Sequence, residues 1–197
     1  MDWLTSIALD PQYHEILTIL KGARNGIVYG AKVRFPHALV MTFLFKSGPL
    51  KGKIKSIFTA TKQHATNLGK FATIYKTMML IQKKLNEGKE SSHHSFLAGA
   101  IGGYIVFKNN TSINQQIILY LFSRIFMALV KLPVKRQVVD APQHSFAIFA
   151  TLIWGTVMWL FKHEADTLQP SLRASMVYIY KDSDTWNSLK TLLWHNK

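Results

Sequence analysis

The sequence contains no cysteine, which excludes a disulfide framework and thiol chemistry. Acidic residues are also scarce: ten Asp and Glu stand against 24 Lys and Arg, and the net charge is +14. Charged residues make up only 17% of the chain, against roughly 25% in soluble domains. The excess of basic residues predicts an anionic partner, either nucleic acid or a lipid surface. Nearly half of the chain is apolar, which suffices for a core and argues against disorder.

Charge is missing altogether from long stretches toward the C-terminus. Residues 141–161 and 91–107 contain no charged residue, and 109–130 contain only Arg124. A membrane helix needs about 20 mostly apolar residues. We therefore expect spans near 93–108, 113–131 and 145–162. The short polar link "KNNTS" predicts a hairpin between the first two, and "VKRQVVDAPQ" predicts an exposed loop before the third.

The first half of the chain is more ambiguous. Residues 35–45 are apolar but too short alone. Either a span near 25–46 extends back over Lys32 and Arg34, or 15–45 is one helix bent at Pro36. Residues 58–82 carry three lysines and form either an amphipathic surface helix or a span near 60–82 with cations facing a polar interior. Between these regions, "KSGPLKGKIK" predicts a Gly-Pro turn inside a cationic loop.

The two terminal segments, 1–20 and 170–197, have the pattern of interfacial helices. Asp10-Pro11 is a suitable helix start. "TWNSLKTLLW" either lies on a headgroup layer or packs on the bundle. The sequence therefore predicts one all-α membrane domain over 1–197, a polytopic bundle of four to five closely crossing helices with amphipathic terminal helices.

Glycines recur at intervals of four residues, at Gly22, Gly26 and Gly30 and again at Gly99 and Gly103. Gly102 forms a further pair with Ala98. In lipid, small residues allow close backbone contact, which supplies much of helix association. We interpret both sets as helix-packing grooves. The alternative for the first set is that Gly22 and Gly26 break a short helix before the membrane.

Two arginines fall in or beside apolar segments. An arginine at mid-bilayer costs about 2.5–3.5 kcal/mol on insertion scales, so such residues usually face a bundle interior or a wet cavity. Arg34 and Arg124 are therefore candidates for a polar face used in transport or partner contact. The alternatives are that Arg34 marks a helix end and that Arg124 extends to the interface.

The stretches "LKGARNGIVYGAKVRFPHALVMTFLF", "FLAGAIGGYIVF", "INQQIILYLFSRIFMAL" and "TLQPSLRASMVYIYKDSDTW" closely resemble the peroxisomal branch of the Tim-type inner-membrane translocase superfamily. The resemblance begins near residue 12 and covers almost all of the remaining chain. It implies a multi-pass, all-helical protein of the peroxisomal membrane. The chain departs from the mitochondrial branch in carrying the apolar run 141–161 beyond the usual four-helix core.

The resemblance also implies delivery by the cytosolic receptor and chaperone of peroxisomal membrane proteins. Targeting signals of this kind combine a cationic cluster with an adjacent span. Two sets of residues fit: Lys46, Lys51, Lys53 and Lys55, and Lys131, Lys135 and Arg136. The alternative for each set is a positively charged loop that only fixes orientation.

No catalytic or metal-binding constellation is present in the sequence: the eight histidines lack ligand spacing, and no nucleophile elbow or phosphate loop occurs. We therefore expect a non-enzymatic scaffold, pore or translocase-like component without a cofactor. Its expected partners are membrane lipids, the cytosolic receptor and further copies of the chain, but not nucleic acid. The alternative is a peripheral basic helical protein that binds anionic lipid or nucleic acid.

Overall fold

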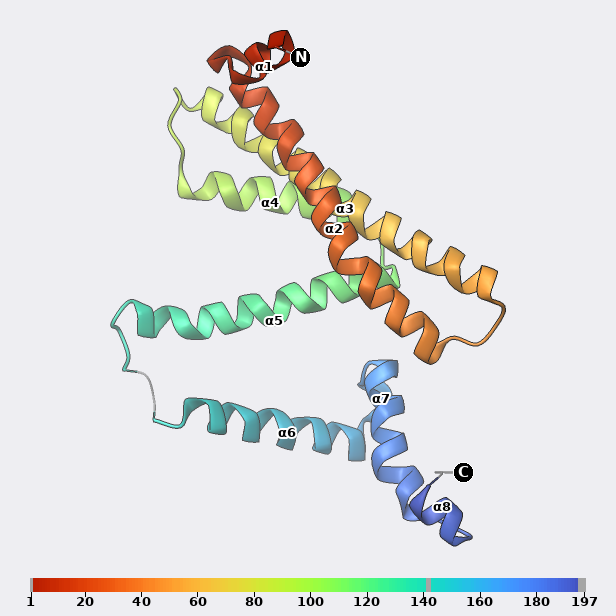
Figure 1. Cartoon of the computed structure of the whole chain (residues 1–197). Helices are drawn as coiled ribbons and strands as arrows, with labels where there is room; N and C mark the ends of the chain where they lie inside the picture. The colour runs from red at the N-terminus through yellow and green to blue at the C-terminus, as the bar shows by residue number, and fades with distance from the viewer. Residues whose placement is uncertain (1, 141–142, 195–197) are drawn as a thin grey trace. The chain divides into compact units, whose positions relative to one another are not determined.

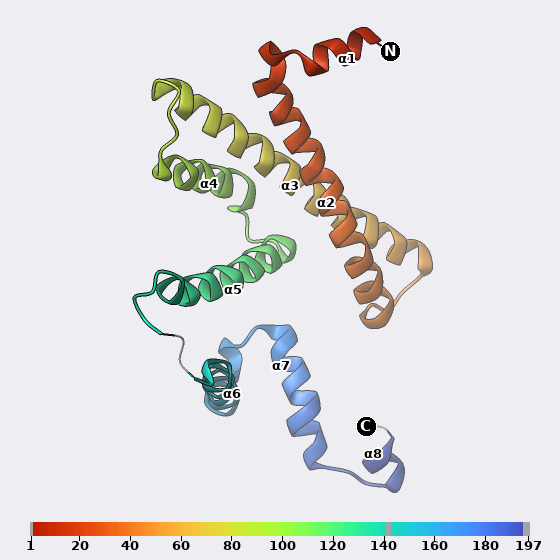
Figure 2. The same ribbon diagram turned by 60° about the vertical axis from the view of Figure 1, so that its left-hand side comes forward.

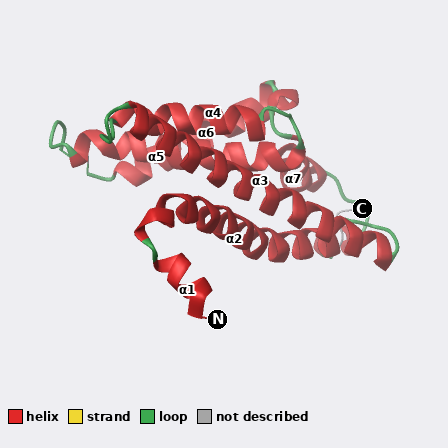
Figure 3. Cartoon of the chain, turned by 90° about the horizontal axis from the view of Figure 1, so that it is seen from above, coloured by secondary structure: helices red, strands yellow, loops and turns green. Residues whose placement is uncertain are grey.

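The computed structural model describes residues 2–140 and 143–194, and every regular element within them is a helix (Figure 3). The predicted all-α class is confirmed. The contacts divide the chain into two compact units, Met1–Met127 and Ala128–Lys197, which are described separately below. The prediction of a single membrane domain over 1–197 is not tested by this division and stays a prediction.

The first unit is organised around one long helical hairpin. Its elements are α1 (Asp2–Leu9), a 3₁₀ turn (Pro11–Tyr13), α2 (His14–Phe45), α3 (Leu50–Leu85), α4 (Ser92–Phe107) and the first part of α5 (Ser112–Lys135). Helices α2 and α3 lie side by side and cross along their length (Figures 1 and 2), and they form the most extensive contact in the protein. Helix α4 packs on α3.

Helix α2 is one continuous element. Asp10 caps the preceding 3₁₀ turn by accepting a 2.9 Å hydrogen bond from the Gln12 backbone N–H, and Pro11 occupies the first position. From His14 the helix continues through Pro36 to Phe45. Of the two readings of this region, the structure has the single helix. The predicted interfacial segment 1–20 is thus divided between α1, the turn and the first residues of α2.

The hairpin turn is shorter than the sequence suggested. Only residues 46–49 lie outside the helices, and Gly48 takes a φ of +116° that other residues rarely adopt. Pro49, with extended backbone, precedes the first residue of α3. Lys51, Lys53 and Lys55 therefore belong to α3, and their assignment to a loop was wrong. Proline is compatible with a helix start, and lysine is a good helix former.

The loop predicted at residues 134–143, after the apolar segment 113–131, also begins later in the structure. Helix α5 continues through Pro133 to Lys135, so Lys131 and Lys135 are helical and Arg136 follows the helix. The link of residues 108–111 between α4 and α5 agrees with the predicted turn.

The second unit contains α6 (Ser145–His163), α7 (Pro170–Met176), a π-helical turn (Val177–Lys181), α8 (Leu189–Leu193) and two 3₁₀ turns (Ala165–Thr167 and Asp182–Asp184). Phe161 of α6 is buried and lies 6.2 Å from the Tyr180 ring, centroid to centroid. The predicted C-terminal helix is shorter than "TWNSLKTLLW", because Ser188 caps it and leaves Trp186 outside.

Within residues 2–140 and 143–194, two helices are long and apolar enough to cross a membrane: α5, with a mean hydropathy of 1.9, and α6, with 1.5. Their apolar side chains point outward, as Phe122 (65% exposed) and Leu152 (63% exposed) show. Helix α4 has only 16 residues, and α2 and α3 carry many cations. Spans near 25–46, 60–82 and 93–108 therefore stay predictions.

Candidate functional site: a glycine-packed helix pair beside a cationic cavity

Gly22, Gly26 and Gly30 all face α3. A Cβ placed on Gly30 would lie 2.7 Å from the Cα of Ala65, and one on Gly26 would lie 2.7 Å from the backbone oxygen of Leu68. These positions leave no room for any side chain, since the obstacle is backbone. At Gly22 the obstacle is the side chain of Lys76, 2.6 Å away at its Cδ. The alternative that these glycines merely break a helix does not hold, because α2 runs through all of them.

The opposing face of α3 uses small residues as well. A Cβ on Gly69 would lie 2.5 Å from Cγ1 of Ile27, and Ala65 is buried. Ala65 and Gly69 are not among the packing residues predicted from the sequence. Their signal was available, because Thr61, Ala65, Gly69 and Thr73 follow the same four-residue interval as the glycines of α2.

The glycines of α4 differ in their surroundings. A Cβ on Gly102 would lie 3.1 Å from Cε2 of Phe71 on α3, and Ala98 on the same face is fully buried. At Gly99 and Gly103 nothing described lies within 4 Å of such a Cβ. The structure therefore brings Gly102 against α3 and leaves Gly99 and Gly103 facing outward.

Asparagine side chains attach the start of α5 to α3. The Asn67 amide donates to Oδ1 of Asn114 at 2.8 Å, and the Asn114 amide donates to the backbone oxygen of Asn109 at 3.0 Å. Gln63 donates to the Thr111 hydroxyl at 3.3 Å. Asn114 is only 4% exposed, so these hydrogen bonds satisfy groups that are costly to bury alone. They fix the N-terminus of α5 beside the hairpin.

Arg34 lies at this junction and is half-buried. Its Nη1 donates to Oε1 of Gln116 on α5 at 2.6 Å, and it also lies 3.5 Å from Nδ1 of His37. Its Nε is buried without a hydrogen-bond partner among the described residues. Arg34 thus faces a polar surface rather than marking a helix end. Arg124 is exposed, with its guanidinium 4.9 Å from the centre of the Tyr120 ring, so the structure does not bring the two arginines together.

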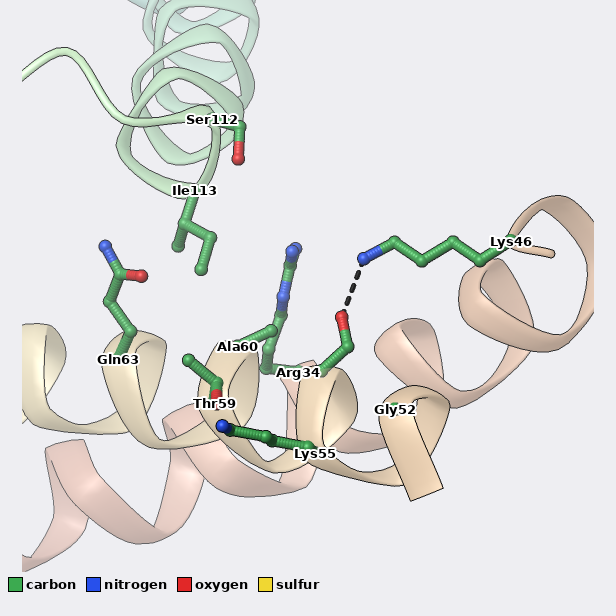
Figure 4. A pocket seen from close by; sticks show the side chains of 10 residues that line it. Arg34, Lys46, Gly52, Lys55, Thr59, Ala60, Gln63, Ser112 and Ile113 are labelled. Carbon is green, nitrogen blue, oxygen red and sulfur yellow. Dashed lines mark hydrogen bonds between the residues drawn. The ribbon is translucent and has the colours of Figure 1, made fainter. Parts of the chain in front are cut away.

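A cavity of about 450 Å³ opens beside Arg34, between α2, the start of α3 and the start of α5 (Figure 4). Its charged and polar lining comprises Arg34, Lys46, Lys55, Ser56, Thr59, Gln63 and Ser112. Lys46 reaches across from the end of α2, and its Nζ donates to the Ser56 hydroxyl at 2.6 Å. No acidic residue contributes to this lining.

The two cationic clusters occupy helix ends. Lys46, Lys51, Lys53 and Lys55 surround the hairpin turn, and Nζ of Lys53 lies 5.4 Å from the centre of the Phe43 ring. Lys131, Lys135 and Arg136 are exposed at and just beyond the C-terminal end of α5. Each cluster adjoins a long helix, and its role in targeting stays a prediction. Among residues 2–140 and 143–194, no three His, Asp or Glu side chains gather as a metal site would need.

These features define a class: an all-helical membrane protein with outward-facing apolar helices and a helix pair joined through small residues. The family model described as "Tim17/Tim22/Tim23/Pmp24 family" matches residues 13–123. The chain is 48% identical over 187 residues to "Peroxisomal membrane protein 4" of Bos taurus and 46% identical to that of Homo sapiens, in each case over 94% of this chain and 88% of the relative.

The chain belongs to the Tim17/Tim22/Tim23/Pmp24 family and is a protein of the peroxisomal membrane. The family match ends inside α5, so α6 lies beyond it. No solved structure matches the chain.

Proposed function

We propose that this chain is a non-enzymatic, translocase-like membrane component whose α2–α3 hairpin offers a polar passenger a hydrated surface within the bilayer. One observation carries the proposal: a half-buried arginine and a polar cavity lie on a glycine-packed helix pair in a membrane protein. Buried charge in a membrane is expensive and commonly marks a pathway for a substrate or ion. The membership in a family named after translocase subunits supports this reading by analogy.

A non-enzymatic role is favoured by what the cavity contains. Its lining provides cations, hydroxyls and an amide but no carboxylate or histidine, so no side chain there is suited to act as a general base near neutral pH. The described residues also bring together no nucleophile with an adjacent base at this cavity. The arrangement is suited to binding and passage rather than to bond cleavage.

The test is reconstitution of the full chain into liposomes loaded with a small polar dye. We expect dye release from these liposomes and a marked reduction for Arg34→Leu, which removes the charge at the junction. The matched control is Arg124→Leu, which removes an equal charge from an exposed position on α5. Release that is equal for the protein-free liposomes and for the wild type would contradict the passage function.

A scaffold is the second candidate, and it is favoured by the outward-facing Gly99 and Gly103. We propose that this pair is a contact between copies of the chain, because small residues four apart allow close helix approach in lipid. Gly99→Leu with Gly103→Leu should reduce chemical cross-linking into dimers. Gly155→Leu is the control, since a Cβ there also meets nothing within 4 Å but the position lies on α6.

For the remaining partners, we propose membrane lipids and the cytosolic receptor of peroxisomal membrane proteins, and no nucleic acid. The cluster of Lys46, Lys51, Lys53 and Lys55 is the stronger receptor candidate, because it adjoins the turn between two long helices. Replacing all four lysines by glutamine should reduce pull-down by the purified receptor. The same replacement at Lys83, Lys84, Lys89 and Lys108 provides a control with equal loss of charge. Equal losses for the two sets would indicate that only net charge matters.

A further inference from the structure

Among the described residues, no acidic side chain lines the cavity beside Arg34. No Asp or Glu occurs between Glu15 and Glu87, or between Glu90 and Asp140. Glu15 is already paired, with its carboxylate 3.4 Å from Nζ of Lys84. Arg34, Lys46 and Lys55 therefore line one cavity without any acidic residue to neutralise them. A half-buried cation without a counter-charge is unfavourable unless something else supplies the charge.

Arg34, which lines the cavity, also carries one unsatisfied donor in addition to its charge. Nε of Arg34 is buried and has no hydrogen-bond partner in the part of the chain that the structure describes, and Nη1 of the same guanidinium donates to Gln116. The guanidinium is thereby fixed in orientation with hydrogen-bonding capacity left over. A planar guanidinium matches the oxygens of phosphate and carboxylate groups. This combination indicates an anionic ligand rather than water alone.

Two further features suit an anion. Ser112 and Ile113 at the N-terminus of the 24-residue α5 line the cavity, and a helix N-terminus favours negative charge. Ser56 and Gln63 add a hydroxyl and an amide as neutral donors. Asn67 and Asn114 hold the start of α5 in place through their 2.8 Å hydrogen bond, so the site is built before any ligand enters.

We propose that this cavity binds a phosphate group, either free or on a lipid, between the Arg34 guanidinium and the ammonium groups of Lys46 and Lys55. Lys46 lies at the hairpin end and Arg34 lies twelve residues earlier on the helix, about 18 Å along its axis. The site thus extends from the hairpin end into the body of the helix pair. This site shares Arg34 with the proposed passage function and rests on it. Anion binding is measured separately from dye release, so either proposal can fail while the other holds.

The test measures binding to the detergent-solubilised full chain by titration calorimetry. The probes are inorganic phosphate, dioctanoyl phosphatidate and, as a zwitterionic comparison, dioctanoyl phosphatidylcholine. Binding of phosphate by itself would identify a soluble anion as the source, whereas binding of phosphatidate without phosphate would identify a lipid headgroup. In both cases we expect Arg34→Gln to weaken binding by about tenfold or more, as loss of a charged hydrogen bond implies.

Lys32→Gln is the matched control, because Lys32 is exposed on the same helix, carries the same charge and does not line the cavity. Its binding should stay within about twofold of wild type. Lys55→Gln, at an exposed position, should weaken binding by about threefold to tenfold. If Arg34→Gln fails to fold, this second variant shows whether the cavity cations bind the anion. The proposal is overturned if neither anionic probe binds, if phosphatidylcholine binds as tightly as phosphatidate, or if Lys32→Gln weakens binding as much as the cavity variants.

Discussion

Two kinds of helix occur in this protein, and they meet their surroundings in opposite ways. Helices α2 and α3 carry many cations and approach each other so closely that the backbone at Gly26 and Gly30 meets the backbone of α3. Helix α6 and most of α5 carry almost no charge and expose large apolar side chains such as Phe122, Leu152 and Trp154. The first kind is held by close backbone contact with a partner helix on its glycine-bearing face, although α2 also exposes large apolar side chains such as Leu20 and Leu44. The second kind exposes apolar side chains along most of its length and suits an apolar surrounding.

The difference between the two kinds of helix indicates which interactions stabilise each region. For the α2–α3 pair, small residues allow extended van der Waals contact between backbones. For α5 and α6, the surrounding lipid removes apolar surface from water, at about 25 cal/mol per Å². Changes that act on lipid exposure should therefore affect α6 most, and changes that act on close packing should affect the pair. Four substitutions separate these effects, in order of expected size.

The largest effect is expected for Ile153→Arg, near the middle of α6. A charge at the centre of a membrane span costs about 2.5–3.5 kcal/mol on insertion scales. Insertion of the segment into microsomal membranes, measured with engineered glycosylation sites, should fall sharply. Ile54→Arg is the control, because Ile54 lies among the lysines at the start of α3, and its insertion should be unchanged. Normal insertion of the Ile153 variant would show that α6 is not surrounded by lipid.

The next effect is expected for Gly26→Ala. The added Cβ would lie 2.7 Å from a backbone oxygen of α3, and overpacking of this kind costs about 1–3 kcal/mol. The thermal midpoint in detergent, followed by circular dichroism, should fall by several degrees. Gly99→Ala is the matched control, since its Cβ meets nothing described within 4 Å and alanine is the better helix former. A higher midpoint for both variants would contradict the close crossing.

A smaller effect is expected for Asn67→Ala, which removes the donor to Oδ1 of Asn114. Leaving a buried acceptor unsatisfied costs about 1–3 kcal/mol, the same range as for the glycine substitution. We expect the lower end here, because the Asn114 amide keeps its own hydrogen bond to Asn109. Cleavage by a protease in the link at 108–111 should become faster, because the start of α5 is released. Gln115→Ala, at an exposed neighbouring position, should leave the rate unchanged. If the two variants are cleaved alike, the asparagine pair does not attach α5.

The smallest effect is expected for Glu15→Gln. The carboxylate lies 3.4 Å from Lys84 and 4.0 Å from Lys83, but all three side chains are well exposed, and surface ion pairs contribute at most about 1 kcal/mol. The thermal midpoint should shift by little more than the error of the measurement, and raised salt should abolish the difference. A loss comparable to that of Gly26→Ala would mean that charge, rather than small residues, joins α2 to α3.

Much of the fold could be predicted from periodicity and composition. The helix over 113–131, the helix over 145–162 and the turn near 108–112 follow from charge-free runs and a short polar link, which are local features. The residues at which helices begin and end were harder to predict from the sequence. Lys51, Lys53 and Lys55 were placed in a loop because glycine and proline precede them, but proline next to a helix start favours the helix that follows.

The site was predictable only in part. The four-residue interval indicated that Gly22, Gly26 and Gly30 form a groove, yet the same interval at Gly99 and Gly103 makes no contact with any residue that the structure describes. The interval is a property of one helix, whereas contact depends on the partner that is present. For the same reason Arg34 and Arg124 could not be separated by sequence, although one faces a polar junction and the other faces outward.

The amino-acid sequence by itself determined that the chain is helical and suited to a membrane, because helix formation and partition into lipid depend on residues near one another in the chain. Only the tertiary structure decided that Arg34, Lys46 and Ser112 border one cavity, and that Gly102 rather than Gly103 meets α3. Those relations join residues of different helices, and they depend on how α2 and α4 each pack against α3.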